Sequence, residues 1–131
     1  VDVTIRHPAS SAYAARAAQE IGVAARRTEE QKRERYPTRD GRSVVPFAVE
    51  TWGRIGEQGE QLLQALAAEA THHARARGHQ ATAGGWRKRW RATLDAVLQR
   101  GIAMCLDAAR CGLPGHAHQR GRRLTQLGEE G

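Results

Sequence analysis

The hydrophobic pattern of the chain centres on one segment. Val44–Gly53 (VVPFAVETWG) is the only long apolar run in the middle of a chain rich in charged residues and alanine. Its β-branched and aromatic residues, closed by a glycine, predict a buried strand. Because proline cannot donate a hydrogen bond to a sheet, Pro46 indicates an edge position or a strand start. Glu50 falls near the carboxyl end of this strand, where α/β folds tend to place their chemistry.

A second strand is predicted at the N-terminus. Residues 1–5 (VDVTI) alternate between apolar and polar, which puts Asp2 on the face opposite the apolar side chains. His7-Pro8 ends the strand because proline fixes its own φ and restricts the residue before it. Two strands form no stable sheet alone. We therefore expect either that helices cover most of the sheet or that part of the sheet lies outside this chain.

Helices are predicted between and after the two strands. Apolar or smooth faces and capping signals predict helices over about 10–20, 23–36, 56–77 and 86–110. The apolar stripe expected on the third helix is Leu62, Leu63, Leu66 and Ala70. The stripe expected on the fourth is Trp86, Trp90, Leu94, Val97, Leu98, Ile102 and Cys105. The predicted class is an α/β (α+β) domain over 1–110, a small incomplete mixed sheet flanked by helices with a helix-rich C-terminal half. A basic, disordered tail is expected over 111–131.

Charge adds a possible partner to this picture. The net charge is +7, and 19 of the 21 cations are arginine, since Lys32 and Lys88 are the two lysines. Arginine-rich positive charge favours phosphate-bearing partners, although a GC-rich genome produces a similar composition. The sequence holds no run long enough to cross a membrane and no signal-peptide pattern. Two cysteines are too few for a disulfide framework, which fits an intracellular compartment.

One cluster of cations lies at the start of the fourth predicted helix, between two tryptophans. Cations at a helix start interact unfavourably with the helix dipole, which makes the cluster a candidate for nucleic-acid binding. A solvated helix face is the alternative, and the two tryptophans also fit a core stripe. The cluster comprises Arg87, Lys88, Arg89 and Arg91.

Three residues are candidates for metal-dependent phosphodiester cleavage. Carboxylates would hold a divalent cation near the scissile phosphate, and a cation would stabilise the developing charge. Asp2 and Glu50 on the two strands and Lys32 on a helix supply these groups. Each residue also has a structural explanation. Asp2 would lie at a frayed terminus, Lys32 would be one cation on a charged helix face, and Glu50 would cap the turn that follows the strand. A zinc site made from the histidines and cysteines is not expected, because their spacing fits no zinc motif.

The order of these residues resembles one family. The series is Asp2-Val3-Thr4-Ile5, then His7-Pro8, then Lys32 with Tyr36 four residues later, then Pro46–Thr51 with Gly53. It is similar to the restriction-endonuclease-like domain at the C-terminus of non-LTR retrotransposon polyproteins, downstream of the reverse transcriptase. The resemblance covers about residues 1–100.

The resemblance implies a PD-(D/E)XK-type fold that nicks target DNA with Mg²⁺ and so primes reverse transcription. Asp2 would be the metal-binding acid, Lys32 the catalytic lysine with Tyr36 beneath it, and Glu50 an acid that only some relatives carry. The resemblance implies DNA as a partner and retroelement RNA as a second one, and it implies a nuclear location. It implies neither a membrane partner nor a small-molecule cofactor.

The sequence departs from the family pattern at its start. The Pro-Asp strand of the family would precede Asp2, so the chain as given is expected to carry half of a metal site, to be inactive and to expose a sheet edge. Two alternatives stay open. One is a non-catalytic, basic, helical module that binds nucleic acid, and the other is a retroelement remnant without function.

Overall fold

Two short strands and four helices make up the part of the chain that the computed structural model describes, residues 1–38, 41 and 43–112. The order is β1 (Asp2–Arg6), α1 (Ala14–Ala17), α2 (Val23–Arg35), β2 (Pro46–Glu50), α3 (Glu57–Ala76) and α4 (Ala83–Arg110). The predicted mixed α/β class with a helix-rich C-terminal half is confirmed. Most of the predicted tail and part of the turn before β2 lie outside the described residues.

The strands β1 and β2 pair in parallel, with Asp2 opposite Pro46 and Arg6 opposite Glu50. All five residues of β2 are buried, as expected for a strand with cover on both faces. Pro46 is the first residue of β2, so its missing N–H costs the sheet little. On the other side of β2, Ile55 forms an antiparallel bridge with Val49 through a tight turn.

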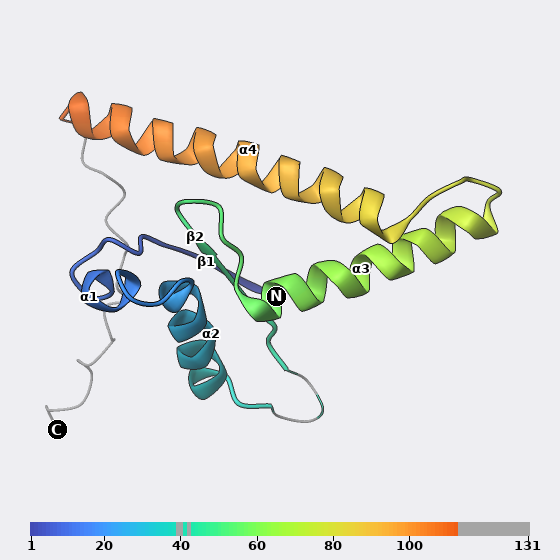
Figure 1. The fold of residues 1–131 in the computed structure, drawn as a ribbon, viewed down its shortest axis with the longest axis horizontal. Helices are drawn as coiled ribbons and strands as arrows, with labels where there is room; N and C mark the ends of the chain where they lie inside the picture. The colour runs from blue at the N-terminus through green and yellow to red at the C-terminus, as the bar shows by residue number, and fades with distance from the viewer. Residues whose placement is uncertain (39–40, 42, 113–131) are drawn as a thin grey trace, which may run out of the picture.

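One face of the sheet is covered by α2, which lies below the strands in Figure 1. This helix runs antiparallel to both strands, as a helix that connects parallel strands must. Its first turn lies at the carboxyl end of β2, and its last turns reach the amino end of β1. The small residues Val23, Ala24 and Ala25 are fully buried and let the helix approach β2 closely.

The other face is covered by a helical hairpin formed by α3 and α4, with α4 above the strands in Figure 1. These helices enclose the hydrophobic core together with β2. Partly buried side chains of Leu62, Trp90, Leu94 and Ile102 pack around it. The buried core residues are Phe47, Val49, Ile55, Leu63 and Leu98.

Several helix predictions need correction. The helix predicted over 10–20 is reduced to the four residues of α1 among turns, because no side chain caps its start and Gly22 follows soon after. On α3 the buried positions recur every four residues, at Gly59, Leu63, Ala67 and Thr71. Leu66, predicted to be in the stripe, is 48% exposed.

On α4 the helix begins at Ala83, three residues earlier than predicted, because the hydroxyl of Thr82 accepts a hydrogen bond from the Gly85 amide and caps it. Val97 and Cys105, which we placed on the apolar stripe, are exposed. Leu98 is the one residue of α4 that is buried among those described.

The apolar face of β1 is uncovered in the described part of the chain. Val3 and Ile5 lie on the same side of the sheet as Phe47 and Val49, since they are their register partners. They are nevertheless 62% and 54% exposed, because the core that α3 and α4 contribute to includes Phe47 and Val49 of β2 and no residue of β1. Asp2 lies on the opposite side, toward α2.

Candidate functional site

Asp2 and Lys32, predicted to belong to one site, lie in direct contact. The Lys32 ammonium is 2.7 Å from Asp2 Oδ2 and donates a hydrogen bond of 3.1 Å to the Asp2 carbonyl. The lysine side chain is 12% exposed and the aspartate side chain 37%. Thirty residues separate the two in sequence, and the crossover through α2 brings them together at the amino end of the sheet.

Glu50, the third predicted catalytic residue, lies at the opposite end of the sheet. It is four residues beyond the register partner of Asp2, which is about 13 Å along a strand. Its buried carboxylate accepts a hydrogen bond of 3.2 Å from the Ala25 amide, in the first turn of α2. The structure therefore does not bring Asp2 and Glu50 together as a shared Mg²⁺ site. Glu50 instead lies at the N-terminus of α2, where a negative charge interacts favourably with the helix dipole.

A second buried carboxylate caps the next long helix. Glu29 on α2 accepts hydrogen bonds from the amides of Gln58 and Gly59 in the first turn of α3. Burial raises the pKa of this carboxyl, and the hydrogen bonds from the two amides lower it by less. Arg33 stands four residues after Glu29, a spacing that allows a pair on the helix surface, but the Glu29 side chain faces α3 instead.

Tyr36, which the family pattern places beneath Lys32, follows the last residue of α2 and is 40% exposed. The Arg35 guanidinium lies over its ring, 5.5 Å from the centroid. The neighbour identified for this partly exposed ring is thus Arg35, the residue directly before it in the chain.

The predicted cation cluster on α4 divides into two pairs. Arg87 and Arg91 face α3, where both form ion pairs with Glu60. Lys88 and Arg89 are exposed. The first pair thus joins the two helices of the hairpin, and the second pair is directed to solvent.

Arg89 also lines a groove of about 700 Å³ where the end of α3 meets the start of α4. Two arginines and a tryptophan line this groove, together with a histidine and a threonine. The Trp86 ring is half-buried and lies 5.6 Å from the Trp90 ring, at an angle of 34°. The lining includes Arg75, His79, Gln80, Thr82, Trp86 and Arg89.

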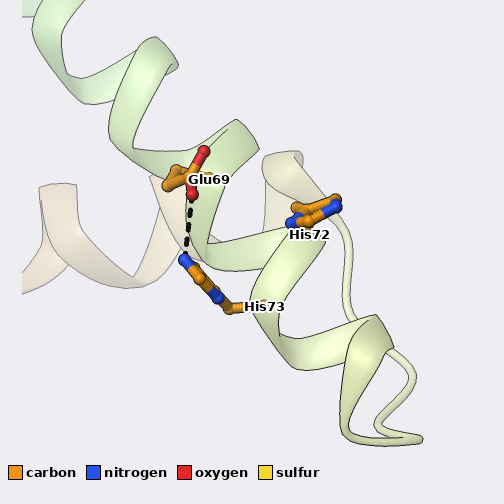
Figure 2. Close-up of side chains that lie close together, drawn as sticks. All are labelled: Glu69, His72 and His73. Atoms are coloured by element: carbon orange, nitrogen blue, oxygen red, sulfur yellow. Dashed lines mark ion pairs between the residues drawn. The ribbon is translucent and has the colours of Figure 1, made fainter.

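A third grouping lies on the exposed surface of α3. Glu69, His72 and His73 follow the spacing i, i+3, i+4, and their ligand atoms all lie within 4.8 Å of one another. Figure 2 shows the Glu69 carboxylate directed toward His73, with 2.9 Å between Oε1 and Nε2. Among the residues that the structure describes, this is the one grouping of three potential metal ligands.

Comparison with protein-family models, with curated proteins and with solved structures finds no match for this chain. Within the described residues, no helix has the length and apolarity that a membrane crossing requires.

Sequence reasoning missed Arg75, His79 and Glu69. A signal was present for each of them. Basic residues near the end of α3 and at the start of α4 must converge when a short loop joins the helices. The Glu-x-x-His-His spacing places three ligands on one helical face.

Proposed function

We propose that this chain is a nucleic-acid-binding domain, and that the groove between α3 and α4 is its binding surface. The observation that carries the proposal is that Arg75, Arg89 and Trp86 line one groove. Guanidinium groups bind phosphate oxygens, and an indole face stacks on bases of any sequence. The net charge of +7 supplies the general attraction to a polyanion.

The N-terminus of α4 lies at the same groove and adds to its positive character. Thr82 and Gly85 both line the groove and form the cap of this helix. The partial positive charge of a helix start favours anions. The cations that we assign to the groove therefore differ from the cluster predicted from sequence. Arg75 and Arg89 line the groove, while Arg87 and Arg91 hold the hairpin together through Glu60.

The binding test is fluorescence anisotropy with a labelled single-stranded DNA oligonucleotide and its duplex, using the whole chain. Arg75→Ala and Arg89→Ala are expected to weaken binding, and Trp86→Leu is expected to weaken single-strand binding most. The matched controls are Arg110→Ala on the far end of α4 and Trp52→Ala, an exposed indole near β1. Unchanged affinity in both arginine variants contradicts the proposal.

A second candidate function rests on the contact between Asp2 and Lys32. The resemblance to retrotransposon endonuclease-like domains implies that these two residues share one site, so their contact supports DNA nicking in which Asp2 contributes to binding Mg²⁺ and Lys32 stabilises the developing charge. Glu50 has no part in this centre, since it caps α2.

The nicking test uses supercoiled plasmid and Mg²⁺. Nicking that is lost in both Asp2→Asn and Lys32→Ala, and kept in Asp107→Asn and Arg100→Ala on the exposed surface of α4, supports the catalytic candidate. DNA binding without nicking leaves the binding function and rejects the catalytic one.

A further inference from the structure

We propose that Glu69, His72 and His73 form a binding site for a divalent transition-metal ion on the surface of α3. This site is independent of the nucleic-acid groove and of the Asp2–Lys32 pair. It differs from the Mg²⁺ site predicted from sequence in its position, its donors and the metals that suit it.

The helix positions the three ligands. They lie within a regular 20-residue helix, so their backbone positions are fixed before any ion binds. Residues three and four apart on a helix are neighbours on its surface. Figure 2 shows the His72 and His73 rings on the same stretch of α3, with ring centroids 5.8 Å apart, and Glu69 one turn before them.

The donor separations suit a small ion after modest side-chain movement. Tetrahedral bonds of about 2.0–2.1 Å place donor atoms about 3.4 Å apart. The Glu69 and His73 donors are already 2.9 Å apart, and no donor pair exceeds 4.8 Å. The required adjustment falls on exposed side chains, since Glu69 and His73 are 68% and 64% exposed, and it leaves the core unchanged.

The donor set selects the class of metal. Two imidazoles and one carboxylate suit Zn²⁺, Co²⁺ and related ions, whereas Mg²⁺ prefers oxygen donors throughout. Three protein ligands leave at least one coordination position open to water or another small ligand. An ordinary surface ion pair would account for the contact between Glu69 and His73. It would not account for the third donor, which His72 places within reach of the other two.

The test is titration of the whole chain with Zn²⁺ by calorimetry and with Co²⁺ by visible absorption. We expect one ion per chain and a tetrahedral or five-coordinate Co²⁺ spectrum. Glu69→Gln, His72→Ala and His73→Ala are each expected to weaken binding by at least about tenfold, the loss that even an outer-shell change causes. Excess Mg²⁺ is expected not to compete. Circular dichroism checks that the exposed substitutions leave α3 folded.

Four control variants, the first of them His79→Ala just beyond the end of α3, separate this site from the other histidines and from the thiols of the chain. His7→Ala removes a distant histidine that bonds to Thr51. A His116→Ala/His118→Ala double variant and a Cys105→Ser/Cys111→Ser double variant remove the alternative ligands. Binding that survives the α3 substitutions, or that disappears in any control, overturns the proposal, as does the lack of one-to-one binding by the parent chain.

Discussion

The carboxylate of Glu29 lies 3.1 Å from the backbone amide of Gln58 and caps α3 from a neighbouring helix. Glu29 itself is buried, with 2% of its surface exposed. A carboxylate at a helix start satisfies amides that have no partner within the helix and interacts favourably with the helix dipole. Two elements that are remote in sequence are thereby fixed against each other.

The first prediction concerns pH. Because burial raises the pKa of Glu29, folding favours its protonated form. The stability that this group contributes is complete below the ordinary pKa of 4.5 and is lost as the pH rises through the raised value. Glu29→Gln keeps an acceptor oxygen and is expected to remove this part of the pH dependence. Urea unfolding from pH 4 to pH 8 measures it, with the exposed neighbour Glu30→Gln as control. A Glu29→Gln curve parallel to the parent curve contradicts the prediction.

The second prediction uses two glycines with opposite expected effects. A Cβ at Gly56 would collide with the Glu29 carboxylate, so Gly56→Ala is expected to destabilise the fold by about 1–3 kcal/mol. Gly101 lies within α4 with open space around it, so Gly101→Ala is expected to stabilise by about 0.5–1 kcal/mol. Chemical unfolding of both variants measures the two signs. A neutral or stabilising Gly56→Ala would show that the close approach to Glu29 does not control this substitution, and a destabilising Gly101→Ala would contradict the second half of the prediction.

The third prediction concerns the docking of α4. Leu98 is the buried residue of this helix and belongs to the core with Phe47 and Leu63. Leu98→Ala is expected to cost about 2–4 kcal/mol through lost burial and the resulting cavity. Leu106→Ala removes the same atoms from a residue that is 61% exposed, and its effect is expected to be within about 0.5 kcal/mol of zero. Equal losses in the two variants would place the contact of α4 elsewhere.

The fourth prediction concerns the salt dependence of DNA binding. Each phosphate contact contributes about 0.7–0.9 to the slope of log affinity against log salt concentration. Arg89→Ala is therefore expected to reduce the slope by about one contact. Trp86→Leu is expected to lower affinity with the slope unchanged, since stacking releases no counterions. A change of slope in the tryptophan variant would reject the assignment of stacking to the indole.

Local sequence signals predicted β2 and the long helices well. The β-branched run, the proline at its start and the glycine after it all favour the same strand, and Pro46 is indeed its first residue. The four-residue spacing of Trp90, Leu94 and Leu98 likewise predicted the face of α4 that meets the core.

Features that depend on contacts between distant segments of the chain could not be predicted from local sequence patterns. Leu66 is a stronger hydrophobe than Thr71, yet Thr71 is buried because it continues the face of α3 on which Gly59, Leu63 and Ala67 are buried. Glu29 and Arg33 have the spacing of a surface pair, yet Glu29 meets free amides whose position depends on the packing of α3. The Asp2–Lys32 contact was expected from the family pattern, whereas the place of Glu50 follows from strand register, which no single segment encodes.

The parallel pairing of β1 has a consequence for hydrogen exchange. The Asp2 amide donates to Val45, and the Arg6 carbonyl accepts from Thr51, so even-numbered residues of β1 turn their backbone groups toward β2. Successive residues of a strand direct these groups to opposite sides, which turns the amides of Val3 and Ile5 away from β2. Deuterium uptake along β1 is therefore expected to alternate, fast at Val3 and Ile5 and slow at Thr4 and Arg6. Any strand that pairs with the outer edge of β1 would abolish the alternation and be detectable by that change alone.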